Sequence, residues 1–148
     1  MELKVPPPVV MLSAAVLMYG LSRLNAGHAW QPPLWLPLLL AAAGLAAAAA
    51  GAFAFRRHRT TISPFHPHKT SALVDSGIFR HSRNPMYLGM ALLLAAWGIW
   101  LGRWPALFGI PLFVLYMNRF QIGPEERMLG EKFGDAYRRY CRQTRRWL

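Results

Sequence analysis

The stretch "RNPMYLGMALLLAAWGIWLGRWP", residues 83–105, opens with a guanidinium and a carboxamide and then runs without charge as far as Arg103. Pro85 stands where the apolar run begins, and the first turn of a helix tolerates its missing N–H. Asn84 just before it is a residue type that commonly caps helix N-termini. The stretch therefore predicts an apolar helix over residues 85–101 that starts directly after a polar pair.

The same alternation of apolar and basic segments extends over the whole chain. The sequence is 54% hydrophobic and carries a net charge of +11, with a mean hydropathy of +0.20. A soluble domain with this charge would suggest nucleic acid as a partner. Here the charge is kept out of long apolar blocks, which indicates a polytopic membrane protein that binds no nucleic acid. Four spans are expected, over residues 7–24, 34–55, 85–101 and 105–119.

The spans differ in length and in composition. The last two are shorter than the roughly 20 residues that cross a bilayer, and the short connection "LGRWP" predicts that they form an antiparallel hairpin. The second span is rich in alanine, with Gly44 and Gly51 seven residues apart on one face. Small residues allow close helix packing. A mildly apolar helix without a specific packing face is the alternative.

Lysine and arginine gather in residues 56–83 and 119–148, whereas the two other connections hold one arginine each. By the positive-inside rule, both basic segments and the N-terminus face the cytoplasm. The opposite ends of the spans carry tryptophans, as an interfacial aromatic belt would: Trp30, Trp35, Trp100 and Trp104. A cleaved signal peptide is the alternative for the first span, although "MELK" is a weak basic start and we favour a retained helix.

The tail predicts a further helix. Pro124, Glu125 and Glu126 suit a helix N-terminus, where acidic side chains meet the positive end of the dipole. An apolar stripe follows beside basic residues, which predicts an amphipathic helix on the bilayer surface, broken at Gly134. The stripe consists of Leu129, Phe133, Tyr137 and Tyr140.

Two separated motifs, "LVDSGIFRHSRNPMYLG" and "EERMLGEKFGDAYRRY", together resemble the isoprenylcysteine carboxyl methyltransferases. Bacterial relatives and the phospholipid N-methyltransferases share this pattern. The resemblance covers the chain from Leu73 to the C-terminus and implies a bacterial inner-membrane enzyme with cytoplasmic termini. The matching residues are Leu73, Val74, Gly77, Arg83, Asn84, Pro85, Tyr87, Gly89, Glu125, Glu126, Leu129, Phe133, Gly134, Tyr137 and Tyr140.

The resemblance implies an all-α integral membrane methyltransferase that uses S-adenosylmethionine. Residues 1–148 would form one domain, with a family-like core over 56–148 and a helix pair over 7–55. Arg83 and Glu126 are the expected catalytic residues, because a guanidinium suits the carboxylate of the cofactor and an acid suits its amine. The expected cofactor-binding residues are Leu73, Val74, Gly77, Phe79, Arg83, Asn84, Pro85, Met86, Tyr87, Glu125 and Glu126.

Several alternatives stay open at this point. An ion pair between Arg83 and one of the two glutamates would close the hairpin without binding a ligand. Ser71 and Asn84 replace histidines of the eukaryotic carboxyl methyltransferases, so the methyl acceptor is left as a lipophilic molecule from the bilayer. An NADPH-dependent membrane reductase and a non-catalytic membrane scaffold are the rival functions. The histidines match no standard metal spacing, and we expect no metal; they are His58, His66, His68 and His81.

Overall fold

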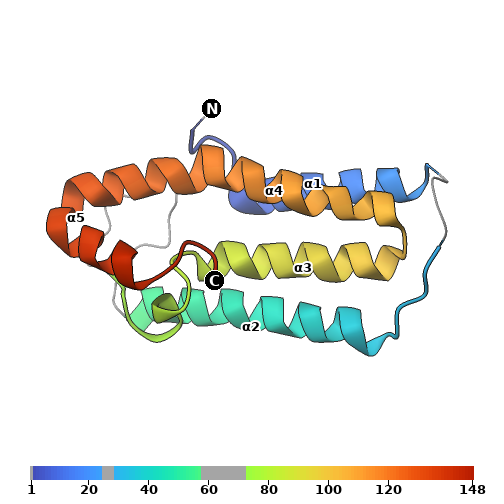
Figure 1. Cartoon of the computed structure of the whole chain (residues 1–148), viewed down its shortest axis with the longest axis horizontal. Coiled ribbons are helices and arrows are strands. Elements are labelled where there is room, and N and C mark those ends of the chain that lie inside the picture. Colours follow the sequence, from blue (N-terminus) through green and yellow to red (C-terminus); the bar gives the residue numbers. More distant parts are fainter. Residues whose placement is uncertain (1, 25–28, 58–72) are drawn as a thin grey trace.

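The computed structural model describes residues 2–24, 29–57 and 73–148, and every regular element in these ranges is helical (Figure 1). The apolar helices are α1 (Pro7–Ser22), α2 (Trp35–Arg57), α3 (Pro85–Leu101) and α4 (Gly109–Tyr116). The 3-10 helices η2 (Gly77–Arg80) and η3 (Trp104–Phe108) precede α3 and α4. A π-helix, η4 (Met117–Ile122), joins α4 to α5 (Gly123–Gln143). The expected all-α class is confirmed.

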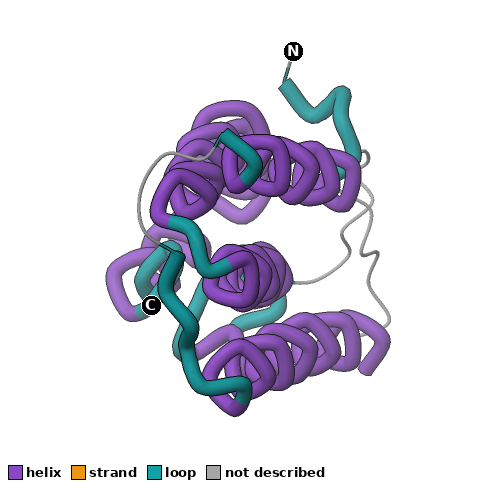
Figure 2. Tube along the Cα trace, turned by 90° about the vertical axis from the view of Figure 1, so that its right-hand side faces the viewer, coloured by secondary structure: helices purple, strands orange, loops and turns teal. Residues whose placement is uncertain are grey.

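Helix α3 lies in the middle of the molecule, with α2 on one side and α1 and α4 on the other (Figure 1, Figure 2). Met18 of α1, Leu94 of α3 and Phe113 of α4 are almost completely buried in one core cluster. The first helix therefore belongs to the packed core. Its retention after synthesis stays our prediction.

The close contact of α2 with α3 depends on glycines. A Cβ atom added at Gly44 would lie 2.8 Å from the carbonyl oxygen of Gly89, and one at Gly51 would lie 2.8 Å from the Met86 side chain. A Cβ added at Gly89 would lie 2.6 Å from the Gly44 carbonyl oxygen and 3.0 Å from the Ala48 backbone nitrogen. The specific packing face expected for Gly44 and Gly51 is therefore present, because only small residues let the two backbones approach this closely.

The outer surfaces of the helices are apolar. Val16, Leu39, Phe53 and Leu115 have exposed fractions of 60–71%. Such surfaces are unfavourable in water and suit contact with lipid chains. Helix α2, with 23 residues, is long and apolar enough to cross a membrane, whereas α1 and α3 are shorter apolar helices of 16 and 17 residues. The crossing of the membrane by each of four segments stays a prediction.

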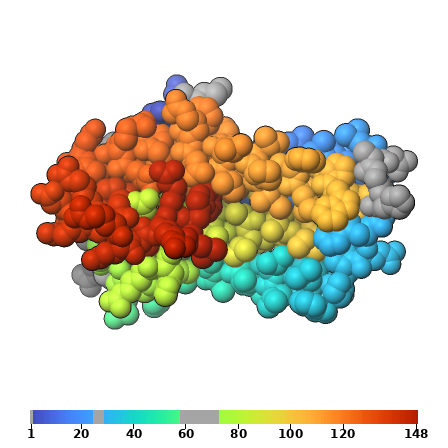
Figure 3. Space-filling model, viewed as in Figure 1, coloured from blue at the N-terminus to red at the C-terminus, as the bar shows by residue number. Residues whose placement is uncertain are grey.

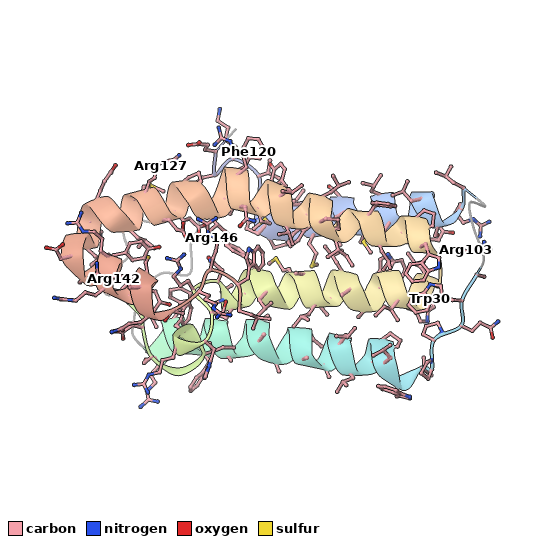
Figure 4. All side chains as sticks on the ribbon, viewed as in Figure 1. Trp30, Arg103, Phe120, Arg127, Arg142 and Arg146 are labelled. Atoms are coloured by element: carbon pink, nitrogen blue, oxygen red, sulfur yellow. The ribbon has the colours of Figure 1, made fainter. Side chains whose placement is uncertain are left out.

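The two ends of the molecule differ in chemistry. At one end Trp30 stacks on Trp104, with 5.3 Å between the ring centroids, and the backbone N–H of Trp30 donates to the Gly102 carbonyl at 3.0 Å. Trp30 and Arg103 lie together at this end, while the labelled arginines of α5 and the tail lie at the other (Figure 4). The start of α1, the end of α2 and the start of α3 share the end with α5 (Figure 1). This arrangement agrees with the expected separation of basic segments and tryptophan belt.

The start of the tail helix differs from the prediction. The helix that contains the fourth span does not end near Arg119, because η4 continues without a break into α5. Ile122, directly before α5, has helical dihedral angles, so Pro124 and the two glutamates do not sit at a free helix N-terminus. Dipole compensation there was a wrong interpretation. Pro124 has no N–H for the carbonyl of Phe120, and the backbone N–H of Leu3 donates to that carbonyl at 3.0 Å.

The expected break at Gly134 is confirmed. Gly134 has φ 52° and ψ −122°, outside the helical region, and the chain reverses there so that the second half of α5 folds back toward α2 and α3 (Figure 1). A positive φ is accessible to glycine without the steric cost that a Cβ brings. The first half of α5 continues beyond α4 instead of turning at the end of the span (Figure 1). Whether either half lies on the bilayer surface stays a prediction.

The α2–α3 contact gives a stability test. Gly89→Ala should lower the free energy of unfolding by about 1–3 kcal/mol, because the new methyl group meets backbone atoms that no rotamer change can move. Thermal unfolding of the purified protein in detergent measures this. Gly20→Ala is the matched control, since nothing lies within 4 Å of a Cβ at Gly20. Equal melting temperatures for the two variants would contradict the close approach of the backbones.

The topology gives a second test. Reporter fusions placed after Asn25 and after Arg103 should both report the outer side of the membrane, since both positions lie in connections poor in lysine and arginine. A fusion at the C-terminus is the control and should report the cytoplasm. Cytoplasmic reporter activity at either of the first two positions would contradict the four-span topology.

Candidate active site

The polar pair before α3 is held by the C-terminal tail. Pro85 occupies the first turn of α3, as expected, and Asn84 occupies the N-cap position. The Asn84 side chain makes no capping hydrogen bond; its Nδ2 donates to the carbonyl of Arg146 at 3.0 Å. Asn84 is thus the N-cap residue as expected, but its amide is oriented so that Nδ2 meets the tail, and no capping bond to its side chain forms.

The carboxylate of Glu126 lies between two arginines. Arg83 Nη2 lies 3.0 Å from Oε1 of Glu126. Arg146 donates from Nε to Oε1 at 3.1 Å and from Nη2 to Oε2 at 2.5 Å. Arg83 and Glu126 are 14% and 19% exposed, whereas Arg146 is 41% exposed. Arg83 and Glu126 thus come together as expected, and the hydrogen bonds to Glu126 raise the pKa of Arg146.

Glu125 faces the opposite way, toward α3. Its Oε1 accepts hydrogen bonds from the Tyr87 hydroxyl at 2.6 Å and from Gln121 Nε2 at 3.1 Å. Burial raises the pKa of the Glu125 carboxyl to about 7; the two hydrogen bonds oppose this shift, and the negative charge of Glu126 adds to it. The adjacent glutamates therefore differ in their partners, because Glu126 has two cationic partners and Glu125 has only neutral donors.

Three apolar members of the expected cofactor-binding set lie in a second packed cluster. Val74 and Phe79 are buried there together with Tyr137 and Tyr140 of the second half of α5, and Leu73 packs against them. The Tyr140 hydroxyl donates to the Phe79 carbonyl at 2.8 Å. Gly77 begins η2 with a φ of 62°. This cluster fixes the folded-back half of α5 against η2, next to the Glu126 ion pairs.

Two residues of the expected cofactor-binding set pack against α2 instead. Pro85 and Met86 lie against Gly51 of α2, within 3.3 and 2.8 Å of the position of its added Cβ. The polar members of the expected set form two groups. Arg83, Asn84 and Glu126 meet at the tail residue Arg146, and Tyr87 pairs with Glu125 on the side of α3.

Comparison with known proteins identifies the family. Residues 33–136, from the start of the second span to the folded-back half of α5, match the phospholipid methyltransferase family. The chain belongs to the phospholipid methyltransferase family. This is a family of membrane methyltransferases that use S-adenosylmethionine. The match agrees with the methyltransferase class predicted from the two motifs and favours a methyltransferase over a reductase.

Part of the chain is also similar to one bacterial protein. The chain is 52% identical over 63 residues to an uncharacterized protein of Haemophilus influenzae; the match spans 43% of this chain and all of that protein. No solved structure matches the chain.

The polar cluster fits the amino-acid part of the cofactor that this family uses. That part carries an α-carboxylate and an α-amino group. Arg83 and Arg146 offer guanidinium N–H donors for the former, and Glu126 offers an acceptor for the latter. The Nε of Arg83 is buried and has no hydrogen-bond partner, so this methyltransferase keeps a donor at the site that no described residue satisfies. Such buried donors are rare unless a ligand, ion or water meets them.

The sequence reasoning missed the residues of the tail that complete the cluster. Arg146 is one of several arginines in a basic segment, and nothing local distinguishes it from its neighbours. Trp147 donates from Nε1 to Asn118 Oδ1 at 3.1 Å, which ties the tail to η4. Only the tertiary contacts show that these residues belong to the polar cluster and not to an exposed charged terminus.

Some expectations fall outside the described residues. Ser71, His58, His66 and His68 lie in the range 58–72, which the structure does not describe. The roles considered for these residues therefore stay untested. Within the described ranges, no group of three or more histidine, cysteine, aspartate or glutamate side chains is placed to hold a metal ion.

The raised pKa of Glu125 predicts a pH-dependent stability difference. Between pH 4.5 and about 7 the unfolded carboxyl is ionised while the folded one keeps its proton, so stability of the native protein falls as pH rises through this window. Glu125→Gln removes the ionisation but keeps an acceptor oxygen for Tyr87. The variant should therefore gain stability relative to the native protein from pH 5 to pH 8, by an amount on the order of 3 kcal/mol.

Thermal unfolding in detergent at several pH values measures this difference. Asp135→Asn is the control, because Asp135 is an exposed partner of Arg138 with a side chain that is 81% exposed. The raised pKa of Glu125 would be contradicted if the stability difference between Glu125→Gln and the native protein stayed constant from pH 5 to pH 8.

Proposed function

We propose that this protein transfers a methyl group from S-adenosylmethionine to a lipophilic acceptor at the cytoplasmic end of α3. The observation that carries the proposal is the convergence of Arg83, Arg146 and Glu126 at this end, with the buried Nε of Arg83 lacking a protein partner. S-adenosylmethionine, when bound, supplies an electrophilic methyl group on a sulfonium. The charged side chains would bind and orient its amino-acid part.

What the reaction needs from the protein is mainly alignment and exclusion of water. Methyl transfer is an in-line displacement, and fixed orientation of the two reactants lowers its barrier more than acid–base chemistry does. The rigid apolar cluster of Val74, Phe79, Tyr137 and Tyr140 beside the ion pairs supports such alignment. Burial raises the pKa of Glu125 to about 7, so its ionised form would be able to accept a proton near neutral pH; a protonated amine acceptor must lose a proton before it attacks, whereas a carboxylate acceptor need not.

The acceptor would come from the bilayer. The helices on either side of α3 expose large apolar side chains, and the polar cluster lies at one end of these helices. A charged cofactor would reach the site from the aqueous side, since its charges cross hydrocarbon at high cost. An acceptor with an apolar tail in the membrane and a polar head at the interface meets it there. A prenylated cysteine, a phospholipid amine and a small lipophilic thiol or acid all satisfy this description.

Transfer of a radiolabelled methyl group tests the proposal. Purified protein in detergent, incubated with labelled S-adenosylmethionine and a lipid extract, should label material that partitions into organic solvent. Arg83→Ala and Glu126→Ala should each reduce cofactor affinity about 30-fold or more, because the first removes a poorly exposed cation beside the site and the second leaves both arginines without their carboxylate.

Arg138→Ala is the matched control. This arginine pairs with Asp135 on the exposed surface of α5, with 68% of its side chain exposed, and its loss should leave labelling unchanged. Labelling confined to water-soluble acceptors and unaffected by lipid would contradict a bilayer acceptor. Normal cofactor binding by folded Arg83→Ala and Glu126→Ala would show that the site lies elsewhere.

A further inference from the structure

The C-terminal residues 144–148 form a strap across the start of α3. The backbone N–H of Arg83 donates to the Arg145 carbonyl at 3.0 Å, and Asn84 Nδ2 donates to the Arg146 carbonyl at 3.0 Å. On the surface, the strap covers the junction of α5 with the segment that leads into α3 (Figure 3). The strap therefore belongs to the polar cluster and is not a loose terminus.

Anchors on both sides hold Arg146 in place. Before it, Thr144 is buried and its hydroxyl bonds to the Arg80 carbonyl at 3.4 Å. After it, Trp147 packs against the main core and bonds to Asn118. The side chain of Arg146 lies between the strap and α5 (Figure 4). Because the backbone on each side is fixed, little conformational freedom remains to be lost when this guanidinium binds a ligand.

The charges in the cluster do not balance. Glu126 carries one negative charge, and Arg83 and Arg146 carry two positive charges. Glu125 bonds to Tyr87 and Gln121 and not to either arginine, and burial raises its pKa to about 7. One positive charge therefore remains for an anionic group to neutralise.

The geometry of Arg146 indicates where such a group would bind. Its Nε and Nη2 both donate to Glu126, so the ion pair uses one edge of the guanidinium. Nη1 makes no hydrogen bond to the residues that the structure describes, which leaves the second edge of the planar fork for another carboxylate. With 41% of its side chain exposed against 14% for Arg83, Arg146 is also the more accessible of the two arginines.

We propose that Arg146 is a binding residue for the α-carboxylate of the cofactor, while Glu126 receives its α-amino group and Arg83 holds Glu126 in position through Nη2 and offers its unpartnered Nε to the bound cofactor. This inference rests on the proposed methyltransferase function and assigns to the strap a direct part in cofactor recognition. The affinity for a nucleoside that lacks the amino-acid part should then not depend on Arg146.

Binding of two nucleosides to the full chain in detergent tests this assignment. S-adenosylhomocysteine carries the amino-acid part, and 5′-methylthioadenosine lacks it. Arg146→Ala should weaken binding of S-adenosylhomocysteine about 30-fold and leave binding of 5′-methylthioadenosine within about twofold of the native protein. Arg146→Lys should give an intermediate loss, because an ammonium keeps the charge without the two-edged fork.

Arg145→Ala is the matched control. It removes the same charge from the adjacent, exposed residue, whose contact with Arg83 is through the backbone alone. Calorimetric binding and thermal unfolding are measured on every variant. Should Arg146→Ala prove unfolded, the folded Arg146→Lys variant and the same pair of nucleosides decide the question.

The outcomes separate the inference from the proposed function. Failure of the native protein to bind either nucleoside would overturn both. Tight binding by the native protein with no selective loss in the Arg146 variants would overturn the inference alone. An equal loss for both nucleosides would mean that Arg146 only maintains the fold, and would also overturn it.

Discussion

The carboxylate of Glu126 connects three parts of the chain that lie far apart in sequence, and the polar end of the molecule depends on it. A poorly exposed carboxylate is unfavourable unless cations and hydrogen-bond donors meet it. Arg83 comes from the segment before α3, and Arg146 comes from the strap. Removing the carboxylate would leave two guanidiniums facing each other, so the strap, the start of α3 and α5 are held together by one group.

The continuous helix from α4 to α5 determines which way the two glutamates point. Had the helix ended at Arg119, a loop would have been free to place both side chains in solvent. The π-helix η4 instead carries the chain onward, and Pro124 is accommodated because Leu3 donates to the carbonyl of Phe120. Neighbouring helical residues point about 100° apart. Glu125 therefore reaches Tyr87 on α3 while Glu126 reaches the arginines. π-helical turns recur at functional sites.

Predictions from the sequence were confirmed where the backbone preference or the size of a single residue restricts the local structure. Pro85 marks the start of α3 and Gly134 marks the reversal in α5, since each has backbone preferences that few other residues share. The packing face of Gly44 and Gly51 followed from their size. For Asn84 the N-cap position was correct but the side-chain cap was not, because the amide is oriented with Nδ2 toward a carbonyl of the strap. The wall residues around Phe79 are in a packed cluster that local sequence does not reveal.

The sequence by itself determined the apolar helices and the separation of basic segments from tryptophans. These features follow from hydropathy, from charge and from residues with strong local preferences, all of which are properties of short windows. Only the tertiary structure decided that Arg146 is the second partner of Glu126, that Glu125 turns to Tyr87, and that α4 runs into α5. The tail carries many arginines of equal local character, and which of them meets a buried carboxylate depends on where the folded chain brings the strap.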